Sequence, residues 1–406
     1  MLRLYSVVQF TSTFSNSAGI DFQLYYDSLL ESSGLVLNDE ETRQHFLRFH
    51  NQTEVLIDRE NLHSKFLNTA PALRENLVRE VSEREDLLWI PSLEIDRFRE
   101  SSIGDVRRLC GSKLNSPRKA NLPVVSHFSD ELEIPISFDS RLDFGETCAE
   151  LIGTALDQSN CGSCWAFSTT TALEDRICLA SNGTAKVHLS PLDTLSCCDS
   201  RSGCDSFGCN GGDPASAWEW FVEYGVVTGG EYGDTGTCKP YAFPQCAHHV
   251  NVPGLKPCSG DGEYETPECV SKCTNSKYNV EYGADKRKSL TAYSISPDEA
   301  SIKLEIMKNG PVSAAFMVYE DFLTYKSGIY HHVTGAEIGG HAVKLIGWGQ
   351  DEKSGEKYWI LMNSWNQGWG ENGAFRMKLK EGGIMNEITA GHVESHPRQQ
   401  VEIVTE

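Results

Sequence analysis

The chain has 406 residues and carries 57 acidic against 36 Lys and Arg side chains, a formal net charge of −21. Phosphate binding needs a basic face, so this charge argues against a nucleic-acid partner. The composition, 39% hydrophobic and 10% aromatic, is typical of a globular protein, and no run approaches the roughly 20 apolar residues that a membrane span needs. The length suits two or three domains.

Residues 1–69 are an N-terminal extension to which no motif assigns a role. They contain no cysteine, and they resemble a secretory signal only weakly, because Gln9 and Thr11 interrupt the apolar stretch that follows Arg3. A glycosylation sequon begins at Asn51, and a second one begins at Asn182. We treat the segment as an extension that could hold a cryptic signal.

Residues 70–133 begin with a charged amphipathic stretch. Leu73, Leu77, Val78 and Val81 recur every three or four residues, which predicts a helix within 72–84. Further along, the stretch 117–135 is expected to be extended and loop-like.

Residues 134–406 hold most of the cysteines. Of the 14 cysteines, all except Cys110 lie between Cys148 and Cys273, which leaves an odd number, 13. Dense cysteines indicate disulfides and an oxidising compartment. The odd count leaves at least one thiol unpaired, and such a thiol is either a buried side chain or a nucleophile.

The same part of the chain changes from helical to strand patterns. Asp213 followed by Pro214 predicts a capped helix that ends before Gly225, and Asp298 with Glu299 opens another that stops near Gly310. Helices followed by strands suggest two lobes of different class, and a cleft between such lobes is a favoured place for a ligand. The predicted strands are 312–318, 341–348, 357–363 and 374–379, with a turn at Ser354-Gly355 between the middle two.

The most informative stretch is Gln158-Ser-Asn-Cys161-Gly-Ser-Cys164-Trp165. Its Cys-Gly-Ser-Cys-Trp core matches the local signature of papain-type thiol proteases. Three further motifs follow in family order: Cys209-Asn-Gly211-Gly212, Gly339-Gly340-His341-Ala342 and Asn363-Ser-Trp365. The insertion Cys246-Ala-His248-His249-Val-Asn is similar to the one that marks cathepsin B-like enzymes. The chain therefore resembles the papain family, and within it the cathepsin B-like proteases.

This resemblance implies an α+β, papain-like two-lobe fold, with a helical left lobe, a β-barrel right lobe and the active-site cleft between them. It also implies three regions: the extension 1–69, an inhibitory propeptide at 70–133, here called the prosegment, and a protease domain at 134–406. The mature enzyme would begin near Ile134, and an occluding loop would lie at about 238–273.

The chemistry expected of Cys164 follows from its position. A free thiol is mostly protonated at neutral pH, but a helix N-terminus and a neighbouring imidazolium both stabilise the thiolate. The residue opens an apolar helix that runs to about Ala180. By resemblance Cys164 is the nucleophile, His341 the base, Asn363 the residue that orients the ring, and Gln158 an oxyanion donor.

Two other readings of the cysteines remain to be weighed. Cys161 and Cys164 could form a redox pair, or could begin a zinc site. The resemblance instead implies six disulfides that leave Cys164 unpaired. They are Cys148–Cys178, Cys161–Cys209, Cys197–Cys269, Cys198–Cys204, Cys238–Cys273 and Cys246–Cys258.

The resemblance also implies a specificity. His248 and His249 would bind a substrate's terminal carboxylate and so favour removal of C-terminal dipeptides, with Asp157 as a clasp for His248. The second clasp of the family is lost, because Leu255 and Gly368 stand in its positions, so appreciable endopeptidase activity is expected as well. Residues expected along the substrate are Gly211, Gly212, Gly340, Ala315, Ala342, Pro214, Trp365 and the acidic pocket residue Glu387.

The sequence thus predicts a cysteine peptidase made as a zymogen, with protein and peptide substrates, its own propeptide as inhibitor, cystatin-type inhibitors as further partners, and no cofactor or metal. It would lie in the secretory pathway, in a lysosome or vacuole or outside the cell. The alternative is a catalytically inactive, cathepsin B-like matrix or binding protein.

Overall fold

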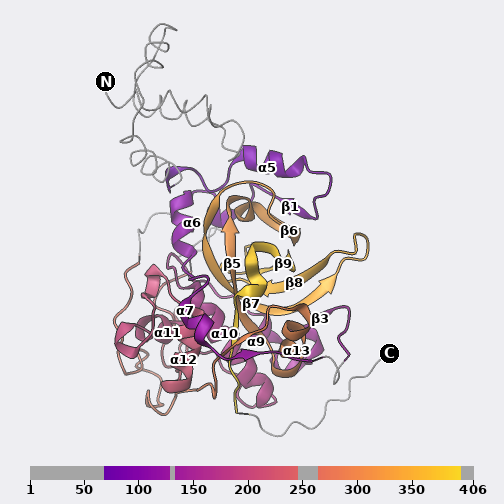
Figure 1. The fold of residues 1–406 in the computed structure, drawn as a ribbon. Coiled ribbons are helices and arrows are strands. Elements are labelled where there is room, and N and C mark those ends of the chain that lie inside the picture. Colours follow the sequence, from indigo (N-terminus) through magenta and orange to yellow (C-terminus); the bar gives the residue numbers. More distant parts are fainter. Residues whose placement is uncertain (1–67, 129–132, 246–263, 395–406) are drawn as a thin grey trace, which may run out of the picture.

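The computed structural model describes residues 68–128, 133–245 and 264–394. Two lobes lie side by side, one of helices and one built on a sheet, and the prosegment runs along both (Figure 1). The papain-like two-lobe architecture is confirmed. No helix among the described residues is long and apolar enough to cross a membrane.

The helical lobe is built around α10, Cys164–Ala180, whose predicted start and end are confirmed. Almost every side chain of this helix is buried, including the charged Glu174, Asp175 and Arg176, so the helix lies at the centre of its lobe. The predicted start of α12, Pro214–Glu223, is confirmed too, because the Asp213 side chain accepts a hydrogen bond from the Ala215 N–H. The other helices of residues 140–200 are α8 Ser140–Asp143, α9 Glu146–Gly153 and α11 Pro191–Cys197.

The second lobe contains one long sheet and the helix α13, Glu299–Asn309, capped by Asp298. The strand order is β1-β6-β9-β8-β7-β5-β10-β4-β2, and β3 pairs with β7. The four strands predicted from sequence correspond to β5 Val312–Tyr319, β7 Glu337–Gln350, β8 Lys357–Met362 and β9 Ala374–Lys378. The remaining strands are β1 Trp89–Pro91, β2 Val124–Val125, β3 Phe138–Asp139, β4 Tyr293–Ile295, β6 Tyr325–Tyr330 and β10 Ile388–Ala390.

The prediction of a β-barrel is wrong in one respect. Among the described residues, no ladder joins the two ends of the strand order, so the sheet is not closed. Both end strands, β1 and β2, belong to the prosegment: β1 pairs antiparallel with β6, and β2 pairs parallel with β4. The prosegment thus covers the two edges that would otherwise be left unpaired.

The prosegment is more helical than predicted. The amphipathic stretch forms α5, Glu75–Ser82, which buries Leu77 and Val81. The expectation of a loop at 117–135 is partly wrong, because α7, Pro117–Asn121, forms there. Ser116 caps it by accepting from the Lys119 N–H, and proline suits a first helical position. Between them, α6 spans Ile103–Leu109 with a capping box of Ser102 and Asp105.

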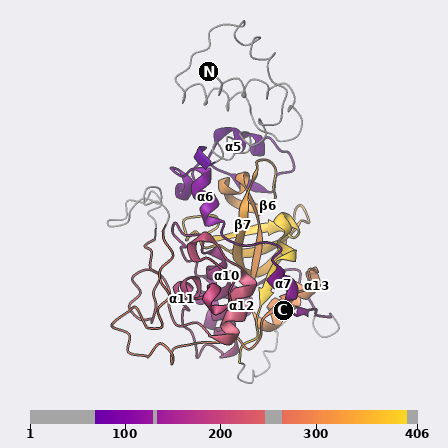
Figure 2. The ribbon, with the colours of Figure 1, turned by 60° about the vertical axis from the view of Figure 1, so that its left-hand side comes forward.

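The views agree on the path of the prosegment. It starts with α5 and α6 at one end of the sheet, passes α12 with α7 and continues into β2 (Figures 1 and 2). Short 3-10 turns complete the described elements: η2 Asp96–Phe98, η3 Ser200–Ser202, η4 Gly208–Asn210, η5 Glu320–Thr324 and η6 Glu381–Asn386.

Five of the six implied disulfides are present, and they tie the helical lobe together. They are Cys148–Cys178, Cys161–Cys209, Cys197–Cys269, Cys198–Cys204 and Cys238–Cys273. The sixth, Cys246–Cys258, lies outside the described residues. Among the cysteines that are described, Cys110 and Cys164 are free.

Candidate active site

Cys164 occupies the first position of α10 and is completely buried. Its thiol is not part of a disulfide, whereas Cys161 is bonded to Cys209. This bond rules out the Cys161–Cys164 redox pair in this structure. Around the thiol lie Ala315 of β5 and Ala342 of β7, which are directly opposite each other in the β5–β7 ladder.

His341 precedes Ala342 on β7 and is fully buried. Its Nε2 lies 2.8 Å from Oδ1 of Asn363, which follows the end of β8. The indole of Trp365 stacks on the imidazole with ring centroids 4.7 Å apart. The amide and the indole together fix the plane of the ring, so that Nδ1 is the nitrogen left for proton transfer.

Burial controls the charge of both groups in this state. It raises the pKa of the Cys164 thiol to about 11, although backbone N–H groups of Ala342 and Gly111 act in the opposite direction. It also lowers the pKa of His341 to about 4, although the hydrogen bond to Asn363 Oδ1 acts in the opposite direction. At neutral pH the pair is therefore a neutral thiol and a neutral imidazole. Burial beneath the prosegment thus disfavours the ion pair expected from sequence.

Gln158 is also fully buried and holds its side-chain amide in a fixed direction. Its Oε1 accepts from the Ser364 hydroxyl at 2.7 Å. Its Nε2 donates to the carbonyl oxygens of Cys161, at 2.8 Å, and of Leu109, at 3.0 Å. Leu109 belongs to the prosegment, so a peptide carbonyl from outside the protease lobes already lies on this donor.

The prosegment backbone fills the groove between Gly212 and Gly340, here called the cleft. Gly212 donates to the Gly111 oxygen at 2.8 Å and accepts from the Lys113 N–H at 2.9 Å, in a parallel bridge. On the other side, the Ser112 N–H donates to the Gly340 oxygen at 2.9 Å.

The glycines of the cleft are needed because the two backbones come so close. A Cβ atom on Gly340 would lie 2.2 Å from the Ser112 oxygen, and one on Gly111 only 2.0 Å from the Gly162 oxygen. Gly211 has a φ of 102°, and a Cβ atom on it would lie 2.8 Å from the Gly111 oxygen. Side chains at these positions would hold a bound peptide away from the hydrogen-bonding groups.

The pocket predicted around Glu387 is occupied in this structure. The side chain of Leu114 packs against Cys164, Ala315 and Ala342. The next residue, Asn115, donates its N–H to Oε1 of Glu387 at 3.0 Å. Burial raises the pKa of Glu387, opposed by the charge of Lys119. Pro214 is buried at the start of α12, two residues after Gly212.

Asp157, the predicted clasp residue, is bound by a prosegment arginine. Arg97 donates to its Oδ1 at 3.0 Å, and both side chains are almost fully buried. Asn366 donates to the other oxygen at 3.0 Å. The expected partner His248, with His249, lies outside the described residues. Arg97 and Leu114 stand in no motif, so the sequence offered no signal for their contacts.

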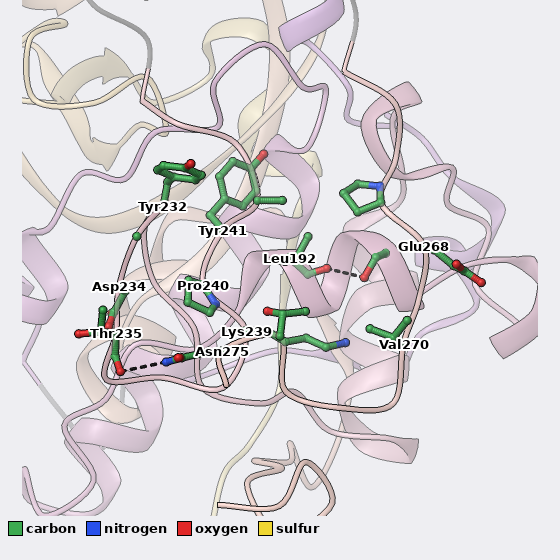
Figure 3. A pocket seen from close by; sticks show the side chains of 15 residues that line it. Leu192, Tyr232, Asp234, Thr235, Lys239, Pro240, Tyr241, Glu268, Val270 and Asn275 are labelled. Atoms are coloured by element: carbon green, nitrogen blue, oxygen red, sulfur yellow. Dashed lines mark hydrogen bonds between the residues drawn. The ribbon is translucent and has the colours of Figure 1, made fainter. Parts of the chain in front are cut away.

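A separate hollow of about 500 Å³ lies on the helical lobe, beside α11 (Figure 3). Tyr232, Asp234 and Lys239 line it, but the Lys239 ammonium already pairs with Asp193 at 2.8 Å. None of the predicted catalytic residues borders this hollow. Within the described ranges, no group of three or more His, Cys, Asp or Glu side chains could hold a metal ion.

Comparison with known proteins gives a consistent assignment. Residues 134–392 match the model of the papain family cysteine protease. The chain is 45% identical over 287 residues to cathepsin B-like cysteine proteinase 4 of Caenorhabditis elegans, covering 70% of this chain and 83% of that protein. It is 42% identical over 327 residues to a cathepsin B-like cysteine proteinase of Schistosoma japonicum, covering 80% and 92%.

Among solved structures, procathepsin B S9 from Trypanosoma congolense is similar with a TM-score of 0.67 and 31% identity, over 80% of this chain and 100% of that one. A digestive procathepsin L 3 of Tenebrio molitor shares the fold, with a TM-score of 0.54 and 21% identity, over 92% of this chain and 100% of that one.

Proposed function

The chain belongs to the papain family of cysteine proteases, among its cathepsin B-like members, and we propose that it both releases C-terminal dipeptides and cleaves internal peptide bonds. That it is a cysteine peptidase made as a zymogen, with the propeptide occupying the protease, follows from the family and the procathepsin neighbour. The proposal concerns the roles of individual residues, the substrates and the place of action.

The observation that carries the proposed mechanism is the carbonyl of Leu109 on the amide of Gln158. A substrate carbonyl in that place would have its oxygen polarised by Gln158 and by the backbone N–H of Cys164. In the open cleft, His341 takes the thiol proton and Cys164 sulfur attacks the carbonyl carbon. His341 then gives the proton to the departing amine, and water hydrolyses the thioester. Asn363 keeps the ring in place through both steps.

The dual mode of cleavage rests on the insertion and its clasps. Two adjacent histidines, His248 and His249, offer imidazolium donors for a terminal carboxylate at acid pH. The clasp formed elsewhere in the family by a cation and a carboxylate has Leu255 and Gly368 in its place. A loop held only at Asp157 opens at a lower cost, and an open loop admits longer substrates.

Glu387 supports a preference at the second residue before the scissile bond. Leu114 indicates that the pocket accepts an apolar side chain, and the nearby carboxylate offers a partner for arginine. Within the proposal, Gly212 and Gly340 hydrogen-bond the substrate backbone as they do that of the prosegment.

The disulfides support a place in the secretory pathway, because such bonds persist in oxidising compartments. A lysosome or vacuole, or the extracellular space, would suit an enzyme activated by loss of its prosegment. Cystatin-type proteins are the inhibitors expected of this site. Glycosylation at Asn182 belongs to the same expectation.

The test uses the processed enzyme and peptides that differ only at the C-terminus. With a free carboxylate, a peptide should lose its last two residues; with an amide it should be cut internally and more slowly. A thiol-reactive epoxide should label Cys164, and Cys164→Ser should remove labelling and cleavage together. A processed chain that neither reacts with the epoxide nor cuts either peptide would be the inactive binding protein instead.

A further inference from the structure

Lys113 of the prosegment makes three contacts with one wall of the cleft. Its Nζ lies 2.6 Å from Oδ2 of Asp205 and donates to the Asp205 carbonyl oxygen at 2.9 Å. The same ammonium stands over the ring of Phe207, 4.9 Å from its centroid. A carboxylate, a carbonyl and an aromatic face together make a receptor for a primary ammonium or a guanidinium.

The wall is held in position before anything binds to it. The Asp205 N–H donates to the Ser216 hydroxyl of α12, and the Phe207 N–H donates to the Gly211 carbonyl at 2.7 Å. The disulfide Cys198–Cys204 immediately precedes Asp205. Phe207 nevertheless exposes 55% of its surface. Because the backbone on both sides of this wall is already fixed, little conformational entropy should be lost when a cation binds to the Phe207 ring.

Asp213 adds a buried carboxylate next to the same wall. It follows Gly212 directly, exposes only 2% of its surface, and caps α12 through Oδ1. Burial raises its pKa, opposed by hydrogen bonds from Ser116 and Ala215 and by the charge of Lys113. The charge of Asp213 in turn contributes to the raised pKa of Glu387. The Asp213 carboxylate therefore interacts electrostatically with both Glu387 and Lys113.

We propose that Asp205 and Phe207 form a cation subsite of the substrate cleft, which binds a lysine or arginine side chain at the third residue before the scissile bond, with the buried Asp213 carboxylate beside it. This inference rests on the proposed function. The main chain of Lys113 is bonded to Gly212, the same glycine that is proposed to bind substrate. The second residue fills the Glu387 pocket and the first lies at Cys164, so the third is the neighbour that reaches this wall.

The preferred substrates are then peptides with a basic residue followed by an apolar or basic one. In the zymogen, Lys113 occupies the subsite and contributes to inhibition. After processing, the vacated wall is anionic and selects cationic peptides.

The experiment compares fluorogenic peptides with Phe-Arg before the scissile bond and Lys, norleucine or Glu at the third position. We expect kcat/KM to fall in that order, with Lys about fivefold above norleucine, because each partly exposed contact of this kind contributes about 0.5–1 kcal/mol. The ratio of Lys to norleucine should decrease toward one in Asp205→Asn and in Phe207→Leu. It should also decrease as sodium chloride is raised, since the contact is electrostatic.

Asp213→Asn keeps the helix cap and removes the charge, so it tests the buried carboxylate without removing α12's first hydrogen bond. Glu146→Gln, at an exposed position in the first turn of α9, is the matched charge control and should leave the ratio as in the parent. Equal cleavage of the Lys, norleucine and Glu peptides would overturn the subsite while leaving the peptidase in place. Failure to cleave any of them would instead remove the proposed function. If Lys is preferred directly before the scissile bond but not at the third residue before it, the wall does not bind the third residue and the proposal is overturned.

Discussion

His127, near the end of the prosegment, places its Nε2 2.6 Å from Oε2 of Glu305 on α13. The other oxygen of Glu305 accepts from Arg176 of α10 at 2.9 Å and from the Tyr293 hydroxyl at 2.6 Å. Although burial acts to raise it, the charge of Arg176 holds the pKa of Glu305 well below its usual range. The prosegment is therefore anchored to the carboxylate that joins the two lobes.

His127→Ala should weaken the anchor without touching the cleft. A hydrogen bond to a charged group contributes about 1.5 kcal/mol, so we expect the precursor to open about tenfold more often. The measurement is the rate at which added mature enzyme cuts a Cys164→Ser precursor that carries the substitution. Phe128→Ala, at the neighbouring exposed side chain, is the control. Equal rates for both variants and the parent would show that the anchor adds nothing to latency.

The buried thiol of the precursor should react slowly. With a pKa of about 11 for Cys164, the thiolate is about one part in ten thousand at pH 7, and its share rises with pH up to that value. In a precursor carrying Cys110→Ser, alkylation by iodoacetamide should accelerate steadily from pH 7 to 10. After processing, the reaction should be fast at pH 5 and nearly flat above it, because the exposed pair can ionise. A fast, flat profile in the intact precursor would contradict the neutral pair.

Removing the amide of Gln158 should slow the chemical step. Loss of one oxyanion donor costs about a hundredfold to a thousandfold in kcat, so Gln158→Ala in the processed enzyme should show this loss with little change in KM. Epoxide labelling of Cys164 checks that the nucleophile remains intact. Gln158→Glu keeps the size and replaces donors by an acceptor, and it should be at least as slow. An alanine variant with parental kcat would exclude this residue as the donor.

Asp175 of α10 should make the fold more stable at acid pH. Burial raises its pKa to about 7, against the charge of Lys344 at 2.6 Å, whereas an unfolded aspartate titrates near 3.9. Between about pH 4 and 7 the folded chain holds a proton that the unfolded chain has released, so this group lowers the free energy of unfolding as pH rises through that window.

Asp175→Asn should remove this part of the pH dependence. Relative to the parent, the variant should gain stability, by up to a few kcal/mol, between pH 4.5 and pH 7 in guanidinium unfolding of the Cys164→Ser precursor. Glu352→Gln, at an exposed loop position, should not change the slope. A variant whose difference from the parent is the same at both pH values would mean that Asp175 is ionised throughout.

The sequence was sufficient where a local signal decides the structure. Capping residues placed the starts of α12 and α13, and the pattern of apolar residues placed β5, β7, β8 and β9. The motif positions located Cys164, His341, Asn363 and Gln158, and the structure brings Asn363 to His341. The helix α7 was missed although Ser116-Pro117 is a good start signal, because a helix of five residues that buries none of them shows no apolar periodicity.

Contacts between distant residues could not be read in the same way. Arg97 meets Asp157 from 60 positions away, and His127 meets Glu305 from 178. Periodicity identifies which side of an element is buried but not what covers it. The open sheet was missed for a related reason, since closure depends on which strands meet at the edges, and here the prosegment strands β1 and β2 lie at those positions.

The strands β1 and β2 at the two ends of the sheet bear on the stability of the enzyme after processing. Folding completes the sheet with a segment that is later cut away, so the native state that the chain reaches as a precursor is not the state in which it works. We expect the excised protease to persist because its unfolding is slow, and to refold poorly once denatured. Its working lifetime would then be set by the rate at which the native protease unfolds irreversibly.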